Sequence, residues 1–143
     1  MPMLKVERIV IEGNRMKVDV ALQSGAPHRT DQAIAGRALE AVPSLGLHAC
    51  VNSAGPTFAS VIQNTSIPHL LEHLIIDRQV RDDATLTEQS FVGATEWVDE
   101  RAGKAHIEMS FFDDLVALRA LKGAVAQLEE ILAIRPTEQV SER

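Results

Sequence analysis

Aromatic side chains are scarce in this chain of 143 residues: they account for 3% of it, with one Trp and no Tyr. The core therefore has to be aliphatic, and the 45% of hydrophobic residues is enough for one compact domain. Cysteine is rarer still. The single Cys50 excludes an intrachain disulfide and indicates a reducing compartment.

Positive charge is also in short supply. Fourteen Lys and Arg residues stand against twenty Asp and Glu, which gives a net charge of −6, and the basic residues form no cluster along the sequence. Binding to nucleic acid or to an anionic membrane surface rests on a basic footprint, so we expect neither as a partner. The chain also has no apolar run of the ~18–20 residues that a membrane span needs, and no secretory signal. We therefore expect a cytoplasmic protein.

Alternating apolar and polar residues predict two β-hairpins. The first covers residues 4–22 and turns at Gly13–Asn14; the second joins strands within 90–98 and 104–112. The short apolar segment "LGLHACVN", residues 45–52, predicts a further strand.

Helical spacing of apolar residues predicts helices over 31–42, from 67 to about 81, and over 113–134. Thr30 or Asp31 can cap the first helix and Ser66 the second. Hairpins alternating with helices indicate an α+β fold, mainly an antiparallel sheet with helices packed on it. We expect one domain over residues 1–134 and a flexible tail over 135–143.

The segment "IPHLLEHLII" contains the clearest functional pattern. His69 and His73 lie four residues apart on one helix face, where both can bind one metal ion, and Glu72 lies beside them. A zinc ion held by two imidazoles and a third ligand keeps one position open for water, and a nearby carboxylate can take the proton of that water. We therefore predict Zn²⁺ at His69 and His73, with Glu72 as the catalytic base. The alternative is that this polar face is an ordinary solvated helix surface.

Several motifs around the histidines resemble one known family. The segments are "LEAVPSLGLHAC", "GPTF", "NTSIPHLLEHLIIDRQ", "GATEW" and "LVALRALKGAVAQLEEIL". In this order and spacing they resemble the N-terminal domain of cyanophycin synthetases, over residues 39–132. The resemblance implies a domain that holds an extended peptide-like polymer, cuts it, or both. Full synthetases continue into nucleotide-using domains, and this sequence contains no phosphate-binding loop, so we do not expect synthetase activity.

A more distant resemblance concerns the H-x-x-E-H pattern itself. S-ribosylhomocysteine lyase and the pitrilysin-type peptidases carry it on a helix packed against an antiparallel sheet, which implies metal at both histidines and acid–base catalysis by Glu72. The lyases take their third ligand, a Cys, from a strand after the helix. The corresponding segment here, "FVGATEW", has no Cys, and Glu96 is the substitute that we predict as third metal ligand.

Three further residues are candidates for the substrate pocket. His48 and Cys50 form an H-x-C pattern in the predicted strand, with Cys50 as a reserve third ligand or else a small buried hydrophobe. Trp97 can contact a substrate or pack in the core.

Two hypotheses for function follow. The first is a zinc-dependent hydrolase of a peptide or isopeptide substrate; the alternative is a non-catalytic module that binds a polypeptide. A sheet open on one face often completes its site at a two-fold interface, so we also expect a homo-oligomer.

Overall fold

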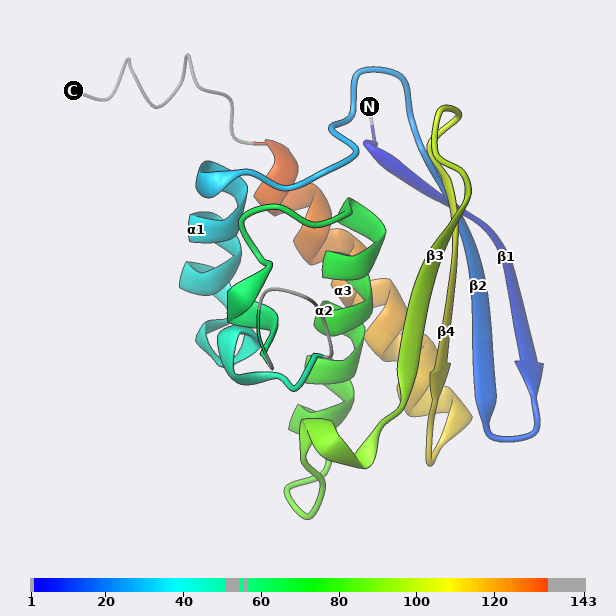
Figure 1. Ribbon diagram of the computed structural model, residues 1–143. Coiled ribbons are helices and arrows are strands. Elements are labelled where there is room, and N and C mark those ends of the chain that lie inside the picture. The colour runs from blue at the N-terminus through cyan, green and yellow to red at the C-terminus, as the bar shows by residue number, and fades with distance from the viewer. Residues whose placement is uncertain (1, 51–54, 56, 134–143) are drawn as a thin grey trace.

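A four-stranded antiparallel sheet forms one side of the molecule in the computed structural model, which describes residues 2–50, 55 and 57–133. The strand order is β1-β2-β4-β3. Helices α2 and α3 lie against one face of the sheet, and α1 lies further from it (Figure 1). The predicted α+β fold with a mainly antiparallel sheet is confirmed.

Both predicted hairpins are present. Strands β1 (Leu4–Glu12) and β2 (Arg15–Leu22) are joined by a two-residue turn in which Gly13 has a φ of +60°, the left-handed conformation that glycine adopts at little cost. Strands β3 (Gly93–Asp99) and β4 (Lys104–Ser110) form the second hairpin. Pairing of β2 with β4 joins the two hairpins into one sheet, so β1 and β3 are its edges.

The three predicted helices begin and end close to the expected residues. Asp31 caps α1 (Gln32–Ala41), and the Ser66 side chain caps α2 (Ile67–Asp82) by accepting a hydrogen bond from the backbone N–H of His69. The third helix, α3, covers Asp114–Ala133. Within the described ranges, no helix is both long enough and apolar enough to cross a membrane.

The prediction of a strand over residues 45–52 is wrong for the part that the structure describes. A 3-10 helix, η1 (Pro43–Leu47), is followed only by an isolated bridge between Ala49 and Thr57; residues 51 and 52 lie outside the described residues. The segment packs on α2, away from the sheet, and so has no strand edge to extend (Figure 1). A second 3-10 turn, η2 (Phe58–Ser60), follows. The predicted tail, 135–143, also lies outside the described residues.

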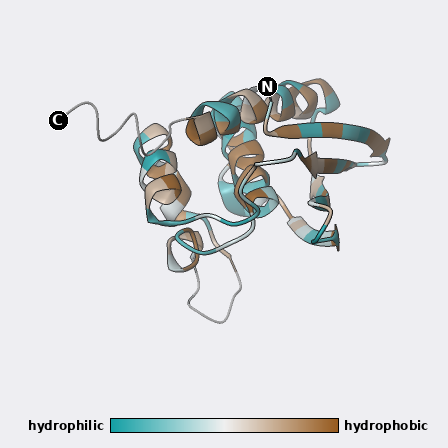
Figure 2. Cartoon of the chain, turned by 90° about the horizontal axis from the view of Figure 1, so that it is seen from above, coloured by the Kyte–Doolittle hydropathy of each residue, from teal (hydrophilic) through white to brown (hydrophobic). Residues whose placement is uncertain are grey.

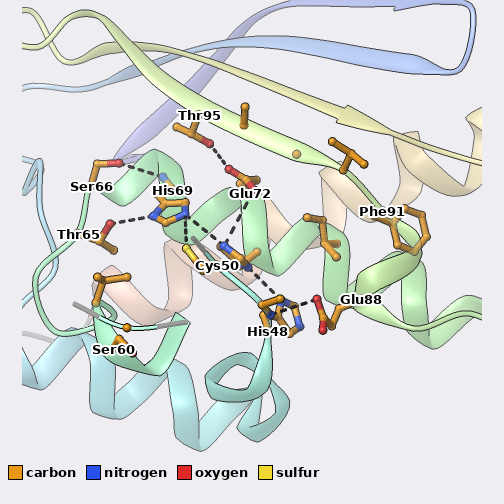
Figure 3. Close-up of a pocket in the computed structure, with 18 of the residues that line it drawn as sticks. His48, Cys50, Ser60, Thr65, Ser66, His69, Glu72, Glu88, Phe91 and Thr95 are labelled. Carbon is orange, nitrogen blue, oxygen red and sulfur yellow. Dashed lines mark hydrogen bonds and ion pairs between the residues drawn. The ribbon is translucent and has the colours of Figure 1, made fainter. Parts of the chain in front are cut away.

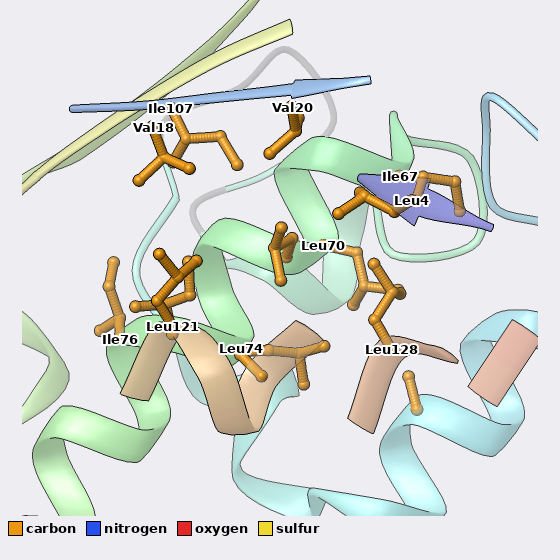
Figure 4. Close-up of a cluster of buried hydrophobic side chains, with 14 of the residues drawn as sticks. Leu4, Val18, Val20, Ile67, Leu70, Leu74, Ile76, Ile107, Leu121 and Leu128 are labelled. Carbon is orange, nitrogen blue, oxygen red and sulfur yellow. The ribbon is translucent and has the colours of Figure 1, made fainter. Parts of the chain in front are cut away.

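The main core lies between the inner face of the sheet and helices α2 and α3 (Figures 2 and 4). Brown, hydrophobic segments of the helices and strands face one another in Figure 2. The side chains that meet there are almost entirely aliphatic, as the composition predicts, and include Val18, Val20, Ile67, Leu70, Leu74, Ile107, Leu121 and Leu128. This packing fixes α2 against the sheet, and with it the position of the histidine motif.

Replacing Leu74 by Ala tests this packing. Leu74 is fully buried, so Leu74→Ala is expected to lower the free energy of unfolding by about 3 kcal/mol, through lost apolar burial and the cavity left behind. The measurement is urea unfolding followed by circular dichroism. Leu115→Ala on α3 is the control, since Leu115 is 65% exposed, and should change stability little. Equal losses in the two variants would contradict the described packing.

Candidate metal centre

The polar side of α2 is buried rather than solvated. Glu72, His73 and Asp77 are only 5%, 4% and 4% exposed. Segments from three other parts of the chain cover them: η1 with His48, η2 with Phe58, and strand β3. The alternative of an ordinary solvated helix surface is therefore wrong, because side chains of this kind are buried only when they have partners.

Three potential metal ligands come together beside α2: Cys50, His69 and His73. Figure 3 shows Cys50 next to His69. One donor atom from each lies within 4.8 Å of the others. The Nε2 atoms of His69 and His73 are 3.2 Å apart, and Cys50 Sγ lies 3.6 Å from His69 Nε2. Around a tetrahedral zinc ion, bonds of about 2.05 Å to nitrogen and 2.3 Å to sulfur place two nitrogens about 3.3 Å apart and nitrogen and sulfur about 3.6 Å apart. The two separations given match these values, and the three side chains together could hold a metal ion.

Glu96, the predicted third ligand, does not reach this group. Successive side chains of a strand point to opposite faces, and on β3 the half-buried Gly93, Thr95 and Trp97 face α2 while Glu96 is exposed on the outer face. There it lies opposite His106 of β4. Cys50, which we considered as the reserve ligand, occupies the place expected for Glu96. It precedes the histidine helix in the chain instead of following it.

Aromatic and hydroxyl contacts orient the two histidine rings. The ring of Phe58, fully buried, stacks on His73 at a centroid distance of 4.1 Å and meets the His69 ring edge-on at 5.1 Å. Thr65 Oγ1 lies 2.8 Å from His69 Nδ1 and can accept its proton, which leaves Nε2 for a metal. Phe58 ends the segment "GPTF" of the family resemblance and lies eleven residues before His69, but its contact with the two rings was not predicted.

A chain of hydrogen bonds fixes the proton on His73. The Asp77 carboxylate only accepts, so His48 donates Nε2–H to it over 3.3 Å and keeps an unprotonated Nδ1. That atom accepts from His73 Nδ1–H at 3.0 Å, and the lone pair of His73 then lies on Nε2, facing His69. Asp77 thus orients His73 through His48 and not directly. His48 is thus buried behind His73, and it is also among the residues that line the cleft described below.

Asp77 is held as a carboxylate by its neighbours. Burial raises the pKa of Asp77, but hydrogen bonds from His48 and Ser44 and the charge of Arg81 more than offset this, so its pKa lies below the usual value. Ser44 Oγ donates to it over 2.6 Å and Arg81 Nε over 2.9 Å. Asp77 therefore stays charged and can accept the hydrogen bond from His48.

Burial keeps both α2 histidines neutral. Burial lowers the pKa of His69. It also lowers the pKa of His73, to about 2, because a proton on His73 would in addition be repelled by protonated His69 and His48. Neutral imidazoles are the form that binds a metal ion, so no proton has to be removed from these rings near pH 7.

Glu72 lies beside the ligand group, between α2 and β3. Its Oε1 accepts a hydrogen bond from the Thr95 hydroxyl over 2.6 Å, and its Oε2 lies 4.0 Å from His73 Nε2. A Cβ on Gly93 would come within 2.8 Å of that Oε2, so only glycine leaves room for the carboxylate here. Burial raises the pKa of Glu72, against the lowering effect of the Thr95 hydrogen bond and of His48. A carboxylate with a raised pKa is suited to take up a proton near neutral pH.

The ligand group opens onto a cleft of about 1700 Å³ between α2, η2 and β3. Trp97, predicted to contact substrate, lies along this cleft on the same side of β3 as Thr95, and its ring lies 5.7 Å from that of His28. Besides Glu72, the charged residues of the lining are Arg29 and Glu88. A volume of about 1700 Å³ exceeds the roughly 300–1,000 Å³ of an ordinary small-molecule pocket, so the cleft has room for more than a small ligand.

No protein-family model, curated protein or solved structure matches this chain. Only the residues of the cleft themselves therefore indicate a function.

His48→Gln tests the hydrogen-bond chain. Without the imidazole, the proton on His73 is no longer directed to Nδ1, and the affinity for zinc is expected to fall about 10- to 100-fold, as is usual when a group that orients a metal ligand is lost. Competition with a chromophoric chelator measures this affinity. His106→Gln is the matched control, because His106 bonds Asp19 on the outer face of the sheet and should leave zinc affinity unchanged. Similar affinities in both variants would contradict the role of His48.

The pH dependence of stability tests the burial of His73. In the metal-free protein, an unfolded histidine binds a proton below its ordinary pKa of 6.5, whereas folded His73 does so only near 2. Stability is therefore complete above 6.5 and falls as the pH falls below it, by about 1.4 kcal/mol per pH unit for this one group, or about 2 kcal/mol at pH 5. Glu72, whose pKa is raised, acts in the opposite direction above 4.5.

Urea unfolding at pH 7 and pH 5 in the presence of a chelator separates the two contributions. His73→Gln keeps Glu72 but removes the histidine, so it should lose less stability on acidification than the unmodified chain. An equal loss in both proteins would show that His73 does not cause the effect.

Proposed function

We propose that this protein is a zinc-dependent hydrolase of peptide- or isopeptide-type amide bonds. Cys50, His69 and His73 are its metal ligands and Glu72 is its general base. The observation that carries the proposal is the convergence of one sulfur and two ring nitrogens at zinc-like separations, beside a buried carboxylate and on the wall of an open cleft. A buried structural network has no need of such a cleft.

The donor set favours zinc over the common hard cations. Imidazole and thiolate are ligands of zinc and of other transition metals, whereas calcium and magnesium take oxygen. Among the described residues only three side chains join the group, so a fourth position remains for a ligand from the cleft. When bound, zinc would polarise a substrate carbonyl and make an attacking water more acidic.

Glu72 supplies the proton transfer. Its carboxylate accepts a proton from the water that attacks the amide carbon, and it gives that proton to the leaving nitrogen as the C–N bond breaks, so that the products are an amine and a carboxylate. Thr95 holds Oε1, so Oε2, the oxygen nearer to His73, is the one available for this exchange. The raised pKa of Glu72 supports both halves of the cycle.

The fold supports the same proposal. A helix bearing H-x-x-E-H and packed on an antiparallel sheet is the arrangement that a resemblance to S-ribosylhomocysteine lyase and the pitrilysin-type peptidases implies. We assign the chain to this metallohydrolase type of α+β fold. Cys50 departs from the lyase pattern, since it comes before the helix, and peptide-like substrates fit the resemblance to the cyanophycin synthetase domain.

Three variants test the proposal together. Purified protein should carry about one zinc per chain by elemental analysis, and Cys50→Ser should lose most of it. Glu72→Gln should keep the zinc but hydrolyse a panel of peptides and side-chain-linked isopeptides at least about 100-fold more slowly. Glu96→Gln, the same change on the outer face of β3, should alter neither zinc content nor rate.

Each outcome decides between hypotheses. Absence of zinc, even after zinc is added, would overturn the metal centre. Zinc without hydrolysis of any substrate, with peptide binding that Glu72→Gln leaves intact, would support the alternative of a non-catalytic polypeptide-binding module.

A further inference from the structure

Three arginines surround a small pocket near the C-terminal end of α2. Arg78 and Arg81 come from α2 and Arg119 from α3, and the pocket between them has a volume of about 230 Å³. Val116 and Ala120 complete the wall on α3 and Asp82 contributes the one carboxylate. The pocket lies between two helices that run side by side in Figure 1. The lining of the metal cleft includes none of these residues.

Gly123 of α3 leaves the space in which the Arg78 side chain packs against that helix. A Cβ at Gly123 would collide with the guanidinium of Arg78, approaching its Cζ within 2.8 Å. Glycine in a helix interior costs about 1 kcal/mol relative to alanine. At position 123 the helix is less stable by this amount, and Arg78 can approach it closely. The Nε–H of Arg78 is buried and has no acceptor among the described residues.

The other two arginines each lie near one carboxylate. Arg81 donates Nε–H to Asp77 over 2.9 Å, and Arg119 lies 3.8 Å from Asp82. Both side chains are more than half exposed, so the other N–H groups of the two guanidinium groups can meet a ligand.

The charge balance of the pocket is unusual for this protein. The whole chain carries a net charge of −6, yet three arginines line this pocket. Arg81 and Arg119 each have one carboxylate nearby, Asp77 and Asp82, whereas Arg78 has no ion-pair partner among the described residues. Like charges in one pocket repel unless an anion lies among them. Guanidinium groups match the oxygens of phosphate with paired, charge-assisted hydrogen bonds.

We infer that Arg78, Arg81 and Arg119 form a binding site for a phosphate group, as inorganic phosphate or as the phosphate of a small molecule. The volume suits a group of this size and not a folded macromolecule. This site is separate from the metal centre, and its test does not depend on hydrolase activity.

The experiment is an NMR titration of the full chain with inorganic phosphate, following the Nε–H signals of its arginines. The signals of Arg78, Arg81 and Arg119 should shift in a saturable way. Arg119→Gln should weaken binding about tenfold, the effect of losing one hydrogen bond to a charged group, and it should fold normally because Arg119 is 71% exposed. Arg101→Gln, in the exposed turn between β3 and β4, is the charge control and should bind phosphate as the unmodified chain does.

Gly123→Ala tests the position of Arg78 without removing a charge. The added methyl group displaces the guanidinium, so phosphate binding should weaken, while the helix itself gains propensity. Gly36→Ala on α1 is its control, since no atom lies within 4 Å of the added Cβ. A phosphomonoester titrated in parallel shows whether the site takes free phosphate or a phosphate carried by a small molecule.

Several results would overturn the inference. One is an absence of saturation at millimolar phosphate; another is an equal response to acetate at the same ionic strength, which would indicate general screening of exposed charges. Shifts confined to His69 and His73 would place the phosphate at the metal centre instead. Unchanged binding in Arg119→Gln and Gly123→Ala would exclude these arginines.

Discussion

Helix α2 carries three polar side chains that are at most 5% exposed, Glu72, His73 and Asp77, and such groups are costly to bury unless each finds a partner. The surrounding structure supplies those partners from distant parts of the chain: Thr95 for Glu72, and His48 for both His73 and Asp77. These partners reach the polar side chains of α2 because η1, η2 and β3 pack around that helix.

The same partners decide what the site can do. Asp77 and His48 direct the His73 lone pair toward His69, and Phe58 fixes both rings, so the positions of two metal ligands are set before any metal binds. Thr95 holds Glu72 by one oxygen and Gly93 leaves space for the other. Stability and chemistry therefore rest on one network, and a change in its outer members should affect metal affinity as well as folding.

A second use of α2 lies at its C-terminal end. Arg81 bonds Asp77, the base of the histidine chain, and also lines the arginine pocket shared with α3. The helix is thus the common scaffold of the metal centre and of the arginine pocket. Both sites depend on a glycine that lets a charged side chain approach a neighbouring element closely, Gly93 for Glu72 and Gly123 for Arg78.

The sequence by itself determined the local elements: alternation located the hairpins, apolar spacing and the caps located the helices, and the i, i+4 spacing placed His69 and His73 together. Alternation on β3 could also have shown that Glu96 faces away from Thr95 and Trp97. Only the tertiary structure decided that Cys50 joins His69 and His73 in a group that could hold a metal ion, and that His48 links Asp77 to His73. Those contacts join residues 19 to 29 positions apart, and periodicity carries no information about which distant segments meet.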